Sequence, residues 1–187
     1  MNSKSLDDVD CSNPRILVLS HCILNQATRW WQKGKPLSKN LGMNINFLRL
    51  LLDLKIGVIQ MPCPEFTFCG NPRPPRTRDE YLNLPGFLKH CVKLADETAN
   101  YLRNLIDNAR EPSIKILAIV GVERSPTCGV KCVPVGMGMD KRYEKKKGIF
   151  IELLLRSLRR VNLEIPIVGI DFDKPQEFVN VIGSLIK

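Results

Sequence analysis

Short apolar runs alternate with segments of helical periodicity along the chain, and this alternation restricts the fold more than any other feature of the sequence. The apolar runs are Ile16–Ser20, Ile56–Met61, Ile114–Val122 and Ile165–Ile170. The third is continuous, as is typical of strands that are buried on both faces of a parallel sheet. Strands that alternate with helices indicate βαβ units. We therefore expect a Rossmann-like, three-layer α/β/α fold with a short, mostly parallel sheet, in the strand order 2-1-3-4.

The segments between these runs divide into helices and loops. Apolar residues recur at helical spacing over Asn40–Lys55, Pro85–Asn108, Gly148–Arg160 and Lys174–Ile186. The proline-rich stretch Cys63–Thr77 is predicted to be an extended loop, because proline disrupts helix interiors. The stretch Glu123–Lys147, which precedes the third of these helices, is rich in glycine and basic residues.

The size and composition of the chain indicate one globular domain. Of its 187 residues, 44% are apolar and 25% are charged, as in ordinary globular proteins. Residues 1–13 are predicted to be a flexible polar tail, and residues 14–187 a single domain. The tail lacks the apolar segment of a signal peptide, and no run approaches the ~20 apolar residues that span a bilayer. We expect a cytoplasmic protein without membrane contact.

Three of the seven cysteines follow three of the predicted strands. They are Cys22, Cys63 and Cys128, and Asp171 follows the fourth strand. Ligands of open parallel sheets bind beyond the carboxyl ends of the strands, so these thiols are expected at one edge. An odd cysteine count in a reducing compartment favours metal binding or catalysis over disulfides. The alternative is that they are buried free cysteines, which are common small hydrophobes.

The spacing of the three cysteines favours a site assembled by the fold. It matches neither the close pairs of zinc fingers nor the ferredoxin patterns. Three thiolates can hold a 4Fe–4S cluster and leave its fourth iron open. Of the other cysteines, Cys91 is expected in the core and Cys11 in the tail, while Cys69 or Cys132 could supply a fourth ligand or a resolving thiol.

Two polar residues near these cysteines are candidate catalytic groups. Glu65 could donate a proton to the substrate or accept one, or could instead form a salt bridge with Arg73 or Arg76. Ser125 could bind the substrate or a cluster sulfur, or could merely cap the turn before Pro126. Two tryptophans, at positions 30 and 31, could stack on a base or pack down as a lid.

The net charge of +9 is open to two interpretations. It could be a lysine-rich solvated surface, or it could attract nucleic acid such as tRNA. No nucleic-acid-binding motif supports the second interpretation. An anionic or nucleotide-like substrate is also compatible with the charge.

Three segments together resemble the 2-thiouracil desulfurase family, and the chain is similar to a divergent member of it. The matching residues are His21-Cys22-Ile23-Leu24-Asn25 with Arg29, Cys63-Pro64-Glu65 with Pro72-Arg73-Pro74, and Glu123-Arg124-Ser125-Pro126-Thr127-Cys128-Gly129. The last of these, Ser-Pro-x-Cys-Gly, is the most specific part.

The resemblance implies an iron–sulfur-dependent desulfurase with a Rossmann-like fold. Cys22, Cys63 and Cys128 would hold a 4Fe–4S cluster, which is easily lost in air, and the open iron would accept sulfur from a thiolated pyrimidine or nucleotide. The alternatives are a zinc- or cluster-binding α/β module without catalysis, and a tRNA-binding protein that uses its basic surface.

The chain departs from the family pattern in two segments. Arg29-Trp30-Trp31-Gln32 stands in place of Arg-Tyr-Asp-Gly, and Phe68-Cys69-Gly70-Asn71-Pro72-Arg73 replaces Gly-Gly-Leu-Pro-Thr-Pro-Arg. Since these segments are expected to line the substrate pocket, the resemblance supports the cluster more strongly than it supports any particular substrate.

Overall fold

A four-stranded parallel sheet forms the centre of the computed structural model, which describes residues 13–37, 42 and 45–186. In sheet order the strands are β2 (Gly57–Gln60), β1 (Arg15–Leu19), β3 (Lys115–Val122) and β6 (Ile167–Ile170). Each neighbouring pair is parallel. The predicted strand order is confirmed, with β6 as the fourth strand.

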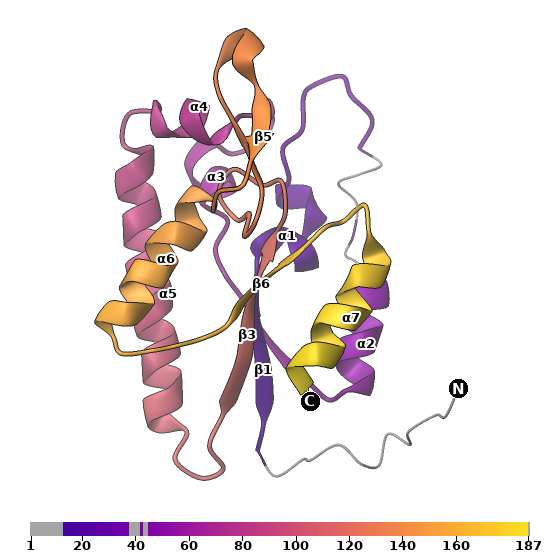
Figure 1. Cartoon of the computed structure of the whole chain (residues 1–187), viewed down its shortest axis with the longest axis vertical. Coiled ribbons are helices and arrows are strands. Elements are labelled where there is room, and N and C mark those ends of the chain that lie inside the picture. Colours follow the sequence, from indigo (N-terminus) through magenta and orange to yellow (C-terminus); the bar gives the residue numbers. More distant parts are fainter. Residues whose placement is uncertain (1–12, 38–41, 43–44, 187) are drawn as a thin grey trace.

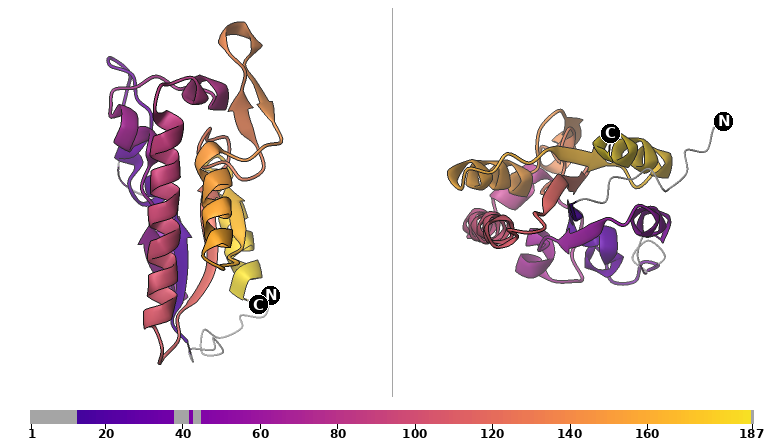
Figure 2. Two further views of the ribbon diagram at one scale, coloured as in Figure 1. Left: turned by 90° about the vertical axis from the view of Figure 1, so that its left-hand side faces the viewer. Right: turned by 90° about the horizontal axis from the view of Figure 1, so that it is seen from below.

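Two pairs of helices cover the two faces of this sheet. They are α2 (Ile45–Asp53) with α7 (Pro175–Ile186), and α5 (Phe87–Asn108) with α6 (Ile149–Arg160). Figure 1 shows α2 and α7 together on one side, and the view from below in Figure 2 shows the layers. The predicted three-layer α/β/α class is therefore confirmed.

The strand side chains alternate between two hydrophobic cores. Leu17 and Leu19 of β1 point into the core beneath α2 and α7, whereas Val18 points into the core beneath α5 and α6. All three are fully buried. Because successive side chains of a strand point to opposite faces, β1 must be apolar on both, which is why its sequence shows no alternation.

The short elements lie beyond the carboxyl ends of the strands or connect them there. They are α1 (His21–Leu24), η2 (Gln26–Thr28), α3 (Pro64–Cys69), α4 (Arg78–Leu82), β4 (Val133–Val135), η3 (Gly138–Asp140) and β5 (Arg142–Glu144). The strands β4 and β5 pair as an antiparallel hairpin.

The loop prediction for residues 63–77 was wrong in part, and the stretch 123–147 holds a hairpin that was not predicted from the sequence. The stretch 63–77 contains α3, because Pro64 occupies the first turn, where a helix needs no N–H donor from it. The next proline, Pro72, comes only after the helix has ended at Gly70, which has a φ of +64°. The stretch 123–147 contains the β4–β5 hairpin, whose three-residue strands are too short to show a clear periodicity.

Some sequence-based predictions fall wholly or partly outside the described residues. The predicted tail at residues 1–13 overlaps the description only at Asn13, and the predicted helix Asn40–Lys55 only from Gly42 and Ile45 onward. Within the described part of the chain, no helix combines the length and apolar character needed to span a membrane.

Candidate functional site

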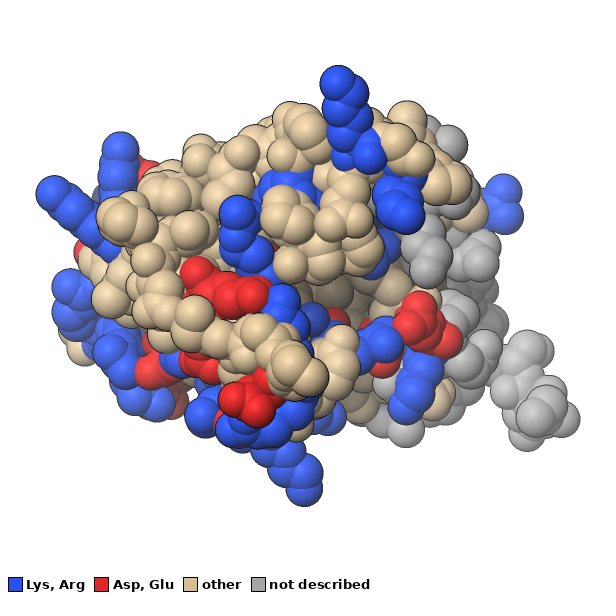
Figure 3. Space-filling view, turned by 90° about the horizontal axis from the view of Figure 1, so that it is seen from above, with Lys and Arg blue, Asp and Glu red and all other residues tan. Residues whose placement is uncertain are grey.

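A cavity of about 720 Å³ opens at the carboxyl edge of the sheet. Figure 3 views the molecule from this end and shows a hollow with basic and acidic side chains around it. Its wall is built from the segments that follow β1, β2, β3 and β6, and Cys22, Cys63 and Cys128 all belong to it. The fold thus brings the three cysteines to one cavity.

Short helices, and not the expected loops, position two of these cysteines. Cys22 lies in α1, which begins directly after β1. The N-cap residue of this helix, Ser20, is tied to the sheet because its backbone N–H donates to the carbonyl of Val120 in β3 at 3.0 Å. Cys63 is the N-cap residue of α3. Both side chains are therefore held by backbone that is hydrogen-bonded to the sheet or to a helix.

Cys128 lies in a turn that folds back onto the end of β3. Its carbonyl accepts from the backbone N–H of Val122 at 2.9 Å, and its own N–H donates to Ser125 Oγ at 3.0 Å. A Cβ atom at Gly121 would lie 2.3 Å from the Cys128 carbonyl oxygen. Only glycine allows this close approach, so Gly121 is needed to place the thiol.

Burial is the main influence on all three thiols. It raises the pKa of Cys22 well above its ordinary value, and the nearby Cys128 and Cys63 raise it further. Burial, then Glu65, raises the pKa of Cys63 to about 12, and burial raises that of Cys128 to about 11 despite a hydrogen bond from Thr127. Near neutral pH the thiols of the empty cavity are therefore protonated.

The donor set suits a cationic group that bridges several thiolates. Cys63 and Cys128 are buried and Cys22 is half-buried. Because these thiols disfavour one another's ionisation, they need a positive charge among them to be held as thiolates. The cavity wall also contains Arg73, which is 3% exposed and whose Nε atom has no hydrogen-bond partner in the described structure. Nevertheless, the described residues include no group of three or more His, Cys, Asp or Glu side chains that could hold a metal ion as they stand.

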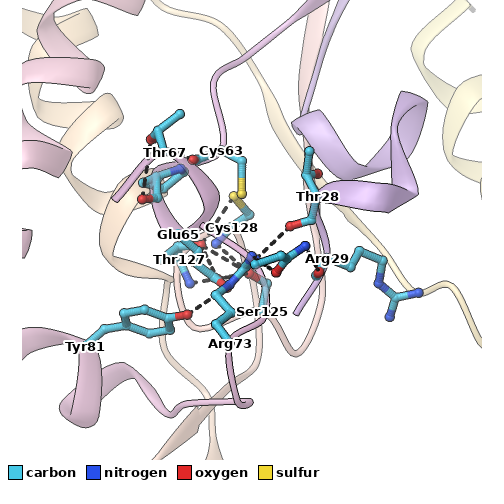
Figure 4. A network of polar contacts seen from close by, with 12 residues as sticks. Thr28, Arg29, Cys63, Glu65, Thr67, Arg73, Tyr81, Ser125, Thr127 and Cys128 are labelled. Carbon is cyan, nitrogen blue, oxygen red and sulfur yellow. Dashed lines mark hydrogen bonds and ion pairs between the residues drawn. The ribbon is translucent and has the colours of Figure 1, made fainter. Parts of the chain in front are cut away.

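Glu65 is the centre of a buried polar network next to the thiols (Figure 4). Thr127 Oγ1 donates to its carboxylate at 2.7 Å and Tyr81 Oη at 3.1 Å. Arg73 forms an ion pair with it at 3.5 Å. Glu65 is 7% exposed and Arg73 3%. Of the two predicted partners, Arg73 is the one that pairs with Glu65, and the carboxylate nevertheless remains on the cavity wall.

Ser125 both caps a turn and borders the cavity. Its Oγ accepts from the backbone N–H groups of Thr127 and Cys128, at 3.4 Å and 3.0 Å. The same hydroxyl lies 3.5 Å from Glu65 Oε1, at the limit of a hydrogen bond. The structure therefore shows Ser125 as the cap of the turn before Pro126. Its hydroxyl also borders the cavity, and a contact between this hydroxyl and a substrate stays a prediction.

Sequence reasoning missed two members of the Glu65 network, Thr127 and Tyr81. Thr127 was only the variable position of the Ser-Pro-x-Cys-Gly element. Tyr81 is fully buried in α4, which begins with a capping box between Thr77 and Glu80. That Thr-x-x-Glu signature was present in the sequence and predicts the helix. Nothing local predicts that Tyr81 would face Glu65.

The other three cysteines in the described part of the chain do not line the cavity. Cys91 is fully buried in a satellite core with Tyr81, Phe87 and Ile149. Cys69 and Cys132 are half-buried, and the residues of the cavity wall include neither. Whether one of them joins the site on cluster binding stays untested. Cys11 lies outside the described residues.

Several charged and aromatic groups form the rest of the cavity wall. Trp30 belongs to it and is 46% exposed, whereas Trp31 is half-buried and donates Nε1–H to the Lys35 carbonyl at 2.8 Å. Arg29 packs over the Phe172 ring at 5.0 Å. Asp171, which follows the fourth strand, forms an ion pair with Arg124, so its carboxylate is already neutralised.

Comparisons with known proteins extend over nearly the whole chain. No protein-family model matches it. An uncharacterised protein of Methanocaldococcus jannaschii is 27% identical over 177 residues, which cover 92% of this chain and 97% of that protein. Among solved structures, the [4Fe-4S]-dependent thiouracil desulfidase TudS is similar, with a TM-score of 0.55 and 18% identity over 91% of this chain and 99% of that one. This likeness establishes a shared fold.

Proposed function

We propose that this protein is an iron–sulfur-dependent desulfurase that acts on a thiolated pyrimidine nucleotide. The observation that carries the proposal is the meeting of Cys22, Cys63 and Cys128, from three separate segments, on one cavity wall beside the buried Glu65. The fold shared with TudS, whose name states a 4Fe–4S-dependent reaction on thiouracil, supports it.

The three cavity cysteines are the proposed ligands of a 4Fe–4S cluster. When bound, such a cluster supplies an iron with an open coordination position that can accept sulfur. Ligation requires thiolates, and the raised pKa values of Cys63 and Cys128, about 12 and about 11, mean that protons must leave the cavity as the site is loaded.

Glu65 is the proposed proton carrier of the reaction. Replacing the sulfur of a thiocarbonyl by the oxygen of water gives a carbonyl and hydrogen sulfide, with no net oxidation. The attacking water must lose a proton and the ring nitrogen or the leaving sulfur must gain one, which a positioned carboxyl can accomplish. Thr127 and Tyr81 hold the Glu65 carboxylate in place, and Ser125 Oγ lies 3.5 Å from the same carboxylate on the cavity wall.

Arg76 favours a nucleotide over a free base as substrate. It lines the cavity, and its Nη1 atom is buried without a hydrogen-bond partner in the described structure. The guanidinium packs 5.7 Å from the centre of the Tyr81 ring. Two neighbouring cations, Lys141 and Arg142, are already paired with Glu80 and Glu144. Arg76 is thus a cation on this wall with an N–H donor that has no acceptor, and a phosphate oxygen could accept a hydrogen bond from it.

Anaerobic purification tests the proposal. We expect a brown protein with about four iron and four sulfide per chain, an electron paramagnetic resonance signal after reduction, and release of hydrogen sulfide from thiolated uridine monophosphates as the thiocarbonyl absorbance is lost. Colourless protein with stoichiometric zinc would contradict the cluster and support a module without catalysis.

A substitution at Arg76 tests the nucleotide assignment separately. Arg76→Ala should raise the KM for a thiolated uridine monophosphate roughly 10- to 100-fold, the effect of losing a hydrogen bond to a charged group. The KM for free thiouracil should stay the same. Equal effects on both substrates would rule out a phosphate contact at Arg76.

A further inference from the structure

The β4–β5 hairpin projects from one end of the molecule (Figures 1 and 2). Lys141, Arg142 and Tyr143, which precede or form β5, also line the cavity wall. Tyr143 and Arg142 are each 61% exposed. The hairpin therefore continues the wall of the cavity outward into solvent and carries an exposed aromatic ring there.

The base of the hairpin is fixed to α4. Thr77 Oγ1 donates to the carbonyl of Gly136 at 2.6 Å, and the N–H of Gly136 donates to Asp79 Oδ2 at 2.6 Å. Gly136 has a φ of +83°, and a Cβ atom there would lie 2.2 Å from the carbonyl oxygen of Asp140. These contacts hold the hairpin in a preformed orientation relative to the cavity.

Positive charge is concentrated in and around this hairpin. Between Lys131 and Lys147 the chain carries six basic residues and two acidic ones. Glu144 neutralises part of this charge by pairing with Arg142 and Lys146. Lys145 and Lys147 are exposed and form no ion pair within the described part of the chain. Two lysines thus remain available beside Tyr143.

We propose that the β4–β5 hairpin and the lysines that follow it bind single-stranded RNA and guide a thiolated residue of that RNA toward the cavity. Exposed aromatic rings next to flexible cations are the combination with which proteins hold single strands, since the ring stacks on a base while the cations follow the phosphates. The delivery of a thiolated base to the cavity rests on the proposed desulfurase function. The binding of RNA itself does not depend on the cluster.

A single strand fits this surface better than a duplex. A thiocarbonyl at the bottom of the cavity can be reached only by a base that has left the stack, and in a single strand this costs least. The hairpin would then contact the neighbouring nucleotides, while the wall at Arg76 holds the phosphate of the nucleotide that enters.

Binding can be measured on the full chain without iron or turnover. We expect the fluorescence anisotropy of a labelled ten-nucleotide single-stranded RNA to report binding at low salt, weaker binding by an RNA duplex, and an affinity that falls as salt rises. Inorganic polyphosphate, which lacks bases, should compete poorly at equal charge.

Two variants and a matched control locate the surface. Tyr143→Ala should weaken binding roughly 5- to 150-fold, the range for one lost base stack. The pair Lys145→Ala and Lys147→Ala should lower the slope of log affinity against log salt by about 1.4. The control pair, Arg110→Ala and Lys115→Ala, removes the same charge where α5 leads into β3, at the end of the molecule away from the hairpin, and should change little.

Several results would overturn the inference. They are the absence of binding at low salt, equal weakening by the control pair, equal affinity for the duplex, and full competition by polyphosphate. RNA binding by a protein that holds no iron even after anaerobic purification would support the RNA surface while contradicting the desulfurase proposal, so the two can fail independently.

Discussion

Buried or half-buried thiols occur in two regions of this molecule, the cavity wall and the satellite core. Cys22, Cys63 and Cys128 lie on the wall, whereas Cys91 packs with Tyr81, Phe87 and Ile149. Burial is the largest cause of the raised pKa in all four cases, and Cys128, Glu65 and Cys63 also affect Cys91. Burial and pKa therefore do not distinguish a candidate ligand from a packing residue. A position on the cavity wall does distinguish them.

The largest expected difference between the two regions is in iron retention. Replacing Cys22, Cys63 or Cys128 singly by Ser should abolish it, because a hydroxyl is a poor substitute for thiolate at iron. Iron and sulfide measured after anaerobic purification provide the check. Iron content that survives any one of the three substitutions removes that residue from the ligand set. An equal loss in Cys69→Ser or Cys132→Ser would indicate a fourth ligand and argue against an open iron.

Glu65 adjoins both regions, and its substitution separates chemistry from cluster binding. Glu65→Gln should lower kcat by about 10²- to 10⁴-fold, the usual contribution of a positioned acid or base, with iron content unchanged. The variant should also be less stable by about 1–3 kcal/mol, because an amide cannot accept hydrogen bonds from Thr127, Tyr81 and Arg73 together. Activity within a few-fold of the native protein would exclude Glu65 as the proton carrier.

The pH dependence of stability should differ between empty and loaded protein. Unfolded thiols ionise near pH 9, while Cys63 and Cys128 do so at about 12 and about 11 in the empty fold. Between these values the folded state holds more protons, so the free energy of unfolding should fall as pH rises, by up to about 1.4 kcal/mol per pH unit for each thiol.

Urea unfolding at pH 8 and pH 10 measures this effect, with Cys63→Ala as the control for other titrating groups. In the cluster-loaded protein the three wall thiols should no longer contribute to the fall, whereas Cys91, with a pKa of about 12, still should. An unchanged pH dependence in Cys63→Ala would show that this thiol is not held neutral by burial.

The smallest expected effect belongs to the satellite core. Cys91→Ala should cost about 1 kcal/mol of stability through lost packing and should leave iron, sulfide and activity unchanged. Chemical denaturation and metal analysis of the same preparation test both parts. A loss of iron in this variant would mean that the satellite core and the cavity wall are not separable.

Local sequence patterns determined the scaffold of this protein. The continuous apolar run at β3 and the shorter runs at the other three strands indicated a parallel sheet, and the positions of Cys22, Cys63 and Cys128 just after strands indicated its functional edge. These inferences succeeded because periodicity and strand ends are local properties, and because parallel topology places all carboxyl ends together.

Only the tertiary structure decided which side chains meet at that edge. Glu65 is hydrogen-bonded by Tyr81 from α4 and by Thr127 from the turn after β3, and the hairpin base is held by Thr77 and Asp79. Cys91 is as buried as Cys63 and Cys128, yet it belongs to the satellite core and not to the cavity wall. Contacts between residues some sixty positions apart depend on how helices and turns pack against the sheet, and no local pattern encodes that packing.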